Sequence, residues 1–407
     1  MEAIRSISLV SPAAAAVIYV IAAATTLIAL LRPNRRTAWA FGTAGVVLAL
    51  VYVVLDIWPR PFPDSVPGFL YAICFGAVFV LFSLLTQRGR RAWLAVVTAI
   101  AMANAYLAAN LEYQQYPTVG SFHPVPVTVP LTLEQFQAAE QASQAPQLDG
   151  REVGALVTLP AAPMRDAVVY VPPAYFHGAT LPVLVLMAGN PGKPMDWFTN
   201  GQAAQTLDDF QATNHGRAPI VVSADATGSE TGNPGCVDGP RLKVATYISQ
   251  DIPALLHETF RVDPDQSRWT VGGLSYGATC ALQVVANHPE AYGSFLSFSG
   301  ESEPSVGNHR KTVDELFDGD EEAFQAVNAA ALLADAAGTS TYRGIAGRFV
   351  AGERDAMSTA ALPHLNDLAR AAGMETTYET VPGAHSYEVW RTALRQNMDF
   401  VAQRGGL

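Results

Sequence analysis

The stretch Trp-Thr-Val-Gly-Gly-Leu-Ser-Tyr-Gly-Ala at residues 269–278 decides the fold of the larger part of this chain. It holds Gly273-x-Ser275-x-Gly277 between an apolar run and an alanine-rich segment, which predicts a strand, a sharp turn and a helix. Side chains two positions before and after the serine would collide with backbone at such a turn, and glycine also adopts its distorted φ. Ser275 would then lie at a helix N-terminus, whose dipole favours developing negative charge. The motif predicts a nucleophilic serine.

Short β-branched runs alternate with helical stretches on both sides of this motif. The expected strands are 167–171, 182–187, 219–224, 269–272, 294–299, 348–351 and 376–380. The expected helices are 201–212, 245–260, 278–287, 321–337, 360–372 and 388–401. This alternation is typical of a mostly parallel sheet with helices on both faces. We therefore expect an α/β domain over residues 151–407.

A serine nucleophile needs a base, and the base needs a carboxylate to orient it; in hydrolases these follow the serine as acid, then histidine. His385 lies between the last expected strand and the last expected helix, where the base belongs. Asp355 and Glu353 both follow the preceding strand; we favour Asp355 as the acid and keep Glu353 as the alternative. The histidines interpreted as surface or capping residues are His288, His309 and His364.

An oxyanion hole in this arrangement uses two backbone amides. One is that of Tyr276, which follows the nucleophile. The other is expected in the Gly/Pro-rich loop 187–197, where Asn190 is the first candidate because Pro191 has no amide hydrogen. The alternative interpretation of this loop is an ordinary turn.

The first 112 residues form a region of different composition. They hold eight arginines, no lysine and four acidic residues, whereas the remainder carries a net charge of −15. Four apolar segments of about 20 residues each are long enough to cross a hydrocarbon core of about 30 Å; they are 9–31, 38–57, 66–85 and 92–111. A signal peptide has one short apolar run, so four argue against it. We predict a four-helix transmembrane domain over 1–112 and a connector over 113–150.

The arginines predict an orientation. The segments 32–36 and 87–91 hold three arginines each, whereas 58–65 holds one arginine and one aspartate. Cytoplasmic loops collect positive charge. The N-terminus and everything after residue 112 are therefore expected outside a cell membrane that the chain crosses several times.

Other functional classes are disfavoured by composition and spacing. A formal charge of −11 does not suit a nucleic-acid partner. The sequence has no His-x-x-x-His, Cys-x-x-Cys or G-x-G-x-x-G after the first strand, so we expect no metal and no cofactor. Cys236 and Cys280 are either a disulfide beside the site or two buried thiols, whereas Cys74 lies in the third apolar segment.

Residues 165–402 resemble the putative-esterase family of α/β-hydrolases, which includes esterase D and the secreted mycolyltransferases of actinobacteria. The resemblance rests on the Gly189–Trp197 loop, on Gly-Leu-Ser-Tyr-Gly, and on His385-Ser-Tyr-Glu-Val-Trp390. Tyr276 stands where the family usually has methionine, and Ala278 where it has glycine. The resemblance implies an α/β-hydrolase fold and serine acyl chemistry.

These observations together predict a membrane-anchored, extracytoplasmic serine esterase or acyltransferase. The combination of four spans and an exterior esterase-like domain resembles a group of actinobacterial membrane proteins. Its substrates are expected to be ester-linked acyl groups of cell-envelope lipids or glycans. The alternative is a non-catalytic envelope-binding protein that uses a hydrolase fold.

Overall fold

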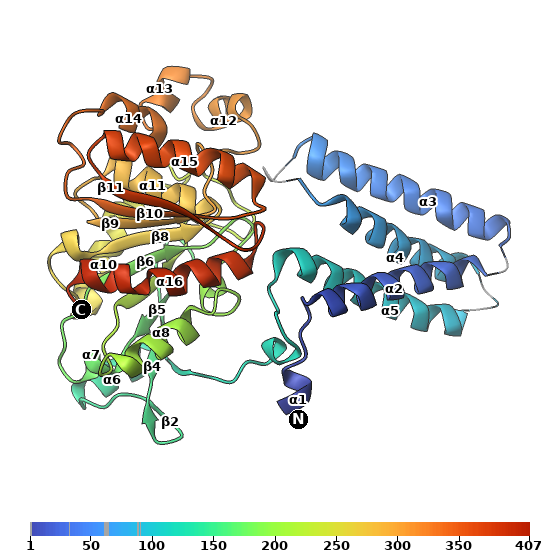
Figure 1. The fold of residues 1–407 in the computed structure, drawn as a ribbon, viewed down its shortest axis with the longest axis horizontal. Helices are drawn as coiled ribbons and strands as arrows, with labels where there is room; N and C mark the ends of the chain where they lie inside the picture. Colours follow the sequence, from blue (N-terminus) through green and yellow to red (C-terminus); the bar gives the residue numbers. More distant parts are fainter. Residues whose placement is uncertain (1, 32, 61–64, 88, 90) are drawn as a thin grey trace. The chain divides into compact units, whose positions relative to one another are not determined.

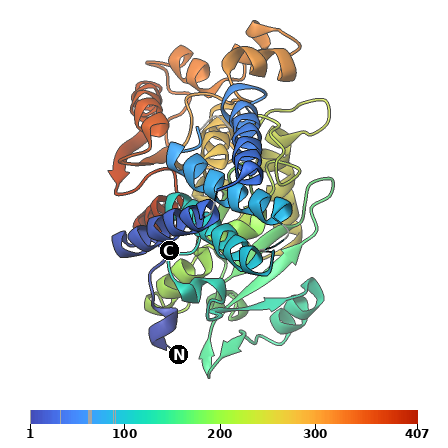
Figure 2. The same cartoon turned by 90° about the vertical axis from the view of Figure 1, so that its right-hand side faces the viewer.

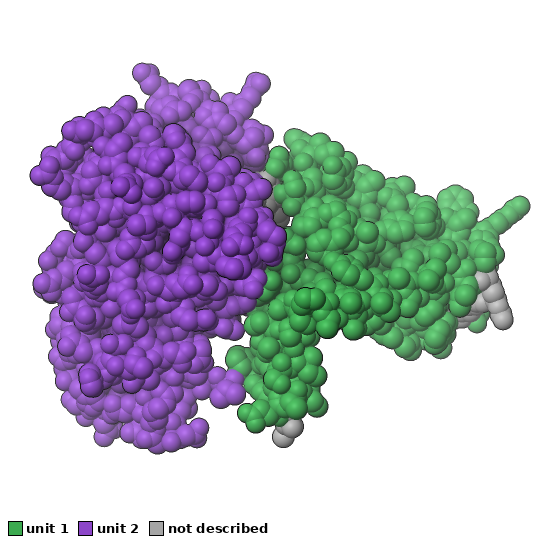
Figure 3. Space-filling view, viewed as in Figure 1, with its two compact units in different colours: residues 1–124 green, residues 125–407 purple. Residues whose placement is uncertain are grey.

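The computed structural model describes residues 2–31, 33–60, 65–87, 89 and 91–407. It divides the chain into two compact units, Met1–Pro124 and Val125–Leu407 (Figure 3). Each unit has hydrophobic clusters of its own.

Among the described residues of the first unit, four helices are long and apolar enough to cross a membrane. They are α2 (Pro12–Leu30), α3 (Arg35–Tyr52, continued by the π-helical turn Val53–Ile57), α4 (Gly68–Thr86) and α5 (Arg91–Tyr113) (Figure 1). The short helix α1 (Glu2–Arg5) precedes them, and a 3₁₀ turn (Val119–Phe122) follows. Trp39, Leu50 and Ile100 are among many large apolar side chains exposed on these helices, a surface that suits hydrocarbon better than water.

Several polar groups in the apolar helices have partners within the unit. Asn104 donates a hydrogen bond of 3.0 Å from α5 to the carbonyl of Ile18 on α2. The Asp56 carboxylate accepts hydrogen bonds from the Val66 amide, at 3.1 Å, and from the Tyr71 hydroxyl. Such pairing is what polar side chains need in an apolar environment. Of the arginines that predict the orientation, Arg32, Arg88 and Arg90 lie outside the described residues.

Residues 125–407, all of which the structure describes, form a nine-stranded sheet in the order β1-β4-β5-β7-β6-β8-β9-β10-β11. The strands are β1 (Thr128–Leu131), β4 (Gly154–Leu159), β5 (Ala167–Val171), β6 (Val183–Met187), β7 (Ile220–Ala224), β8 (Thr270–Leu274), β9 (Ser294–Phe298), β10 (Ala346–Gly352) and β11 (Glu375–Val381). Strand β5 is antiparallel to both neighbours, but the strands from β7 to β11 are parallel. The carboxyl ends of these parallel strands therefore lie at one edge of the sheet.

Helices cover both faces of this sheet (Figures 1 and 2). Helices α8 (Ala203–Thr213) and α16 (Tyr387–Gly405) share one hydrophobic cluster with the sheet. Helices α10 (Ile252–Thr259), α11 (Tyr276–Asn287) and α15 (Ala356–Ala371) share another. The remaining short helices are α7 (Pro173–Phe176), α9 (Val244–Thr246), α12 (His309–Leu316), α13 (Glu321–Gln325) and α14 (Ala329–Asp335). The mostly parallel sheet with helices on both faces is confirmed.

The connector differs from the expected 113–150. Strand β1 pairs with β4, and α6 (Leu133–Gln141) buries Phe136 completely in the core of the second unit. The strands β2 (Gln147–Leu148) and β3 (Arg151–Glu152) form a separate two-stranded sheet. Most of the expected connector thus belongs to the second unit, because its extended and amphipathic segments find partners in the sheet.

Candidate active site

Ser275 occupies the turn between β8 and α11 with φ 53° and ψ −119°, a conformation that L-residues rarely adopt. The flanking glycines explain how the turn fits. A Cβ on Gly273 would lie 2.3 Å from the carbonyl carbon of Gly277, and one on Gly277 would lie 2.2 Å from the carbonyl oxygen of Met187. The expected strand–turn–helix therefore exists, and its tightness requires both glycines.

His385 and Asp355 meet at the same edge of the sheet. Asp355 follows β10 and His385 follows β11, and His385 Nδ1 lies 2.8 Å from Asp355 Oδ2. The two loops are joined by backbone hydrogen bonds of 2.9 Å from Glu353 to Val381 and from Arg354 to Gly383. Parallel pairing of adjacent strands thus brings together side chains that are far apart in sequence.

The environment of Asp355 keeps it ionised. Burial is the largest influence on its pKa and raises it, but the hydrogen bond and charge of His385 and the amide of Ser358 together lower the pKa below the usual aspartate value. An ionised carboxylate only accepts hydrogen bonds, so the shared proton lies on His385 Nδ1. The side chain of the alternative acid, Glu353, is exposed to solvent.

The loop after β6 passes directly beside Ser275. A Cβ on Gly189 would lie 2.8 Å from Leu274 Cδ1 and 3.3 Å from Ser275 Cβ. The next residue, Asn190, has a buried side-chain oxygen with no hydrogen-bond partner among the described residues. Backbone amides at this position can donate to an oxygen that becomes negative near the serine.

Comparisons with known proteins identify the family of the chain. The family model described as "Putative esterase" matches residues 164–401. An uncharacterized protein of Corynebacterium glutamicum is 49% identical over 423 residues, covering 99% of both chains. The chain belongs to the putative-esterase family. This membership makes it an enzyme of the serine hydrolase type, either esterase or acyltransferase, as the sequence predicted.

Two solved structures with TM-scores of 0.50 show the same fold. A ferulic acid esterase matches with a TM-score of 0.50 and 20% identity, over 59% of this chain and 92% of that one. An S-formylglutathione hydrolase from Agrobacterium tumefaciens matches with a TM-score of 0.50 and 20% identity, over 59% and 89%. MPT51 from Mycobacterium tuberculosis matches with a TM-score of 0.45 and 16% identity, over 62% and 99%.

An ion pair with a buried carboxylate supports the loop that carries Asn190, and the sequence analysis did not predict it. Asp225 directly follows β7, and its carboxylate accepts hydrogen bonds from the Arg165 guanidinium at 2.7 and 3.0 Å. The same guanidinium donates at 3.0 Å to the carbonyl of Gly192, whose amide donates at 2.8 Å to Glu230. The available signal was an aspartate at the end of an apolar strand, where a buried charge needs a partner.

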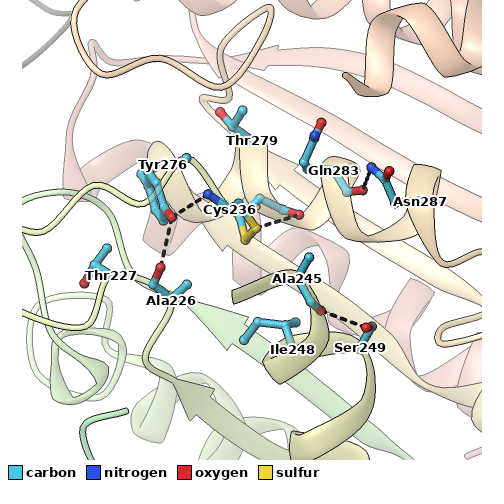
Figure 4. Close-up of a disulfide and its surroundings, with 12 residues drawn as sticks. Ala226, Thr227, Cys236, Ala245, Ile248, Ser249, Tyr276, Thr279, Gln283 and Asn287 are labelled. Carbon is cyan, nitrogen blue, oxygen red and sulfur yellow. Dashed lines mark hydrogen bonds between the residues drawn. A yellow bond between two sulfur atoms is a disulfide. The ribbon is translucent and has the colours of Figure 1, made fainter. Parts of the chain in front are cut away.

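Tyr276, the residue after Ser275, contacts a second loop of the enzyme. Its hydroxyl donates to the carbonyl of Ala226 at 2.9 Å and accepts from the amide of Cys236 at 3.0 Å (Figure 4). Cys236 forms a disulfide with Cys280 of α11, with a Cα–Cα distance of 5.3 Å. The loop after β7 is thus attached to α11, the helix that follows Ser275, by a covalent bond and by two hydrogen bonds.

The structure places the other histidines downstream of Ser275 elsewhere. His309 begins α12 and contacts Glu303 at 2.9 Å and Glu321 at 3.0 Å. His288 caps the end of α11, and His364 lies on α15. Among the described residues, no group of three or more His, Cys, Asp and Glu side chains could hold a metal ion.

Proposed function

We propose that the chain is a membrane-anchored, extracytoplasmic serine esterase or acyltransferase that acts on ester-linked acyl groups of cell-envelope lipids or glycans. The observation that carries the catalytic part is the 2.8 Å hydrogen bond between His385 Nδ1 and Asp355 Oδ2. It lies at the edge of the sheet where Ser275 begins α11. A nucleophile, a base and an orienting acid are the parts that acyl transfer requires.

In the proposed reaction, Ser275 Oγ attacks the ester carbonyl carbon while His385 Nε2 takes the hydroxyl proton. The amides of Tyr276 and Asn190 donate hydrogen bonds to the carbonyl oxygen as it becomes negative. The carbon–oxygen bond to the leaving alcohol then breaks, His385 returns the proton to that alcohol, and the acyl group remains on Ser275. Asp355 holds the imidazole in the required tautomer throughout.

The second half of the reaction repeats these steps with a new nucleophile. His385 takes a proton from water or from an acceptor alcohol, whose oxygen attacks the acyl-enzyme carbonyl. The bond to Ser275 Oγ breaks and the serine regains its proton from His385. Water gives a free acid, so the enzyme is an esterase; an alcohol gives a new ester, so it is an acyltransferase.

The exterior location is supported by two independent features. The arginine-rich segments of the first unit predict that the chain after residue 112 is outside the cytoplasm. The Cys236–Cys280 disulfide suits an oxidising compartment. An alkaline phosphatase fused after Leu407 should therefore be active in cells, whereas a fluorescent protein that folds only in the cytoplasm should stay dark there. The opposite pattern would overturn the orientation.

Covalent labelling of the full-length chain in detergent tests the catalytic proposal. A fluorophosphonate probe should form an adduct that mass spectrometry locates on Ser275, and Ser275→Ala should abolish it. His385→Ala should slow the labelling strongly, and the exposed control Ser302→Ala should label like the wild type. A folded wild-type protein that forms no adduct would overturn the proposal in favour of a non-catalytic envelope-binding protein.

A further inference from the structure

A groove with a volume of about 610 Å³ lies in the second unit, away from the catalytic loops. Its lining includes Arg348, Arg370, Glu375, Phe400, Gln403 and Arg404, and we name it the arginine groove. Ala346 and Glu375, the first residues of β10 and β11, also pair in register at this place. Asp355 and His385 follow the opposite ends of the same two strands. Four residues of each strand, 349–352 and 378–381, therefore lie between the groove lining and the loops of the site, about 13 Å at the usual rise per residue.

The charge of the groove contrasts with that of its unit. Residues 125–407 carry 17 basic and 32 acidic residues, yet this groove holds three arginines and one glutamate. Within the part of the chain that the structure describes, Arg348, Arg370 and Arg404 form no ion pair with a carboxylate within 4.0 Å. Their positive charge is therefore available to a ligand.

Two of the arginines are held in place by the fold. The guanidinium carbon of Arg348 lies 4.1 Å from the centre of the Phe400 ring, a cation–π contact that restrains the side chain. Arg404 Nη2 donates hydrogen bonds of 2.9 and 2.6 Å to the carbonyls of Gly293 and Gly344. Arg370, near the end of α15, is exposed and its side chain makes no hydrogen bond to another described residue. The groove thus combines two arginines held by contacts within the fold, Arg348 and Arg404, with a third, Arg370, whose side chain can change conformation.

We propose that the arginine groove binds an anionic ligand through a phosphate or carboxylate group. Arg348 and Arg370 would donate to the anion, because a guanidinium matches the paired oxygens of both groups. Arg404 would contribute fixed positive charge. Glu375 would accept a hydrogen bond from a hydroxyl or amino group on the same ligand. The volume lies within the range of about 300–1,000 Å³ that is typical of small-molecule sites.

Calorimetric titration of the full-length chain in detergent, in phosphate-free buffer, tests the proposal. The probes are inorganic phosphate, glycerol 3-phosphate and glucuronate. At least one should bind saturably and more weakly at high salt, and the double substitution Arg348→Gln with Arg370→Gln should weaken that binding about tenfold or more. The control is Arg217→Gln, an exposed arginine outside the groove, which should bind like the wild type.

The pattern among the probes identifies the ligand source. Preference for glycerol 3-phosphate points to a lipid or polymer headgroup, and preference for glucuronate points to an acidic glycan. Equal binding of all three probes indicates that the ligand is a free anion. Binding by none of the three at about 10 mM, or equal binding by the double variant and the wild type, would overturn the proposal. If thermal unfolding shows that the double variant is misfolded, the binding measurement is made on Arg370→Gln alone. This substitution should leave the fold intact, because the Arg370 side chain makes no hydrogen bond to another described residue.

Discussion

Arg165 and Asp225, sixty residues apart, form an ion pair with guanidinium–carboxylate hydrogen bonds of 2.7 and 3.0 Å. The Asp225 side chain is 0% exposed, whereas that of Arg165 is 29% exposed. Because Arg165 also donates to the Gly192 carbonyl, the pair joins the end of β7 to the loop that carries Asn190. A stabilising ion pair and the position of a proposed oxyanion amide therefore depend on one side chain.

Arg165→Ala should reduce both stability and turnover. It leaves a buried carboxylate without its partner, which typically costs about 3–5 kcal/mol in the free energy of unfolding, and it releases Gly192. Arg165→Lys restores the charge but not the forked geometry, so stability should recover more than kcat. The control is Arg151→Ala, which breaks the ion pair with Asp208 and should lower stability without lowering kcat. A normal kcat in Arg165→Ala would contradict the positioning role.

The pair also predicts acid sensitivity. Burial is the largest influence on the pKa of Asp225 and raises it, but the hydrogen bonds from Arg165 and Thr227 bring the pKa below the usual aspartate value. Because the pKa of Asp225 is lower in the folded state, its ionised form stabilises the folded protein at pH values above its unfolded-state pKa of about 3.9. This stabilisation is lost as the pH falls through the folded-state pKa. Unfolding by denaturant between about pH 3 and pH 6 should show a smaller loss with acid in Asp225→Asn than in the wild type. Equal losses would refute this assignment.

Asp355→Asn and Glu353→Gln separate the two candidate acids. Asp355→Asn removes the acceptor that sets the imidazole tautomer, so acylation should slow by about 10⁴-fold. Glu353→Gln changes an exposed side chain and should label at nearly the wild-type rate. Rates of fluorophosphonate labelling measure both. The reverse ranking would assign the acid to Glu353.

Tyr276→Phe keeps the proposed oxyanion amide but removes the hydroxyl between Ala226 and Cys236. Two buried backbone groups then lose a partner, at about 1–3 kcal/mol each. Tyr292→Phe is the matched control, because its buried hydroxyl donates to the Ile248 carbonyl at 2.6 Å. Thermal unfolding should show both variants destabilised, but only Tyr276→Phe should lower ester turnover. If turnover falls equally in both, the loss reflects general destabilisation.

Reduction of the Cys236–Cys280 disulfide should destabilise the second unit. The bond closes a sequence separation of 44 residues, for which loss of unfolded-state entropy predicts about 4 kcal/mol. The midpoint of denaturant unfolding should fall when reductant is added. The variant with both Cys236→Ala and Cys280→Ala should start at the lower midpoint and no longer respond. A reductant response in that variant would mean that the bond is not the cause.

The sequence predicted the buried strands of the sheet well. Strand β5 was expected at 167–171, and the structure has the same residues. Strands β6 and β7 begin one residue later than expected. These central strands are buried on both faces, so each is a continuous apolar run with polar or proline-rich flanks. The turn at Ser275 was equally predictable, because it depends on a short local stretch of sequence.

Features that depend on distant partners were not predictable in the same way. Strand β1 has the composition of an extended connector, and only its pairing with β4 makes it a strand. Helix α12 is mostly polar and buries only Thr312 and Val313, so hydrophobic periodicity does not reveal it. The partner of Asp225 could not be found from sequence, because Arg165 precedes Asp225 by sixty residues and strands β5, β6 and β7 lie between them in the chain.

The two glycines that flank the turn at Ser275 change what the motif can be used to infer. Any side chain at Gly273 or Gly277 would collide with backbone, so both are required for β8 to lead into α11 at all. The Ser275 hydroxyl has no such structural duty. A descendant that abandoned catalysis would keep both glycines and be free to replace the serine. In comparisons across diverging genes, the glycines therefore report inheritance of the scaffold, and the identity of residue 275 reports whether the proposed chemistry has been kept.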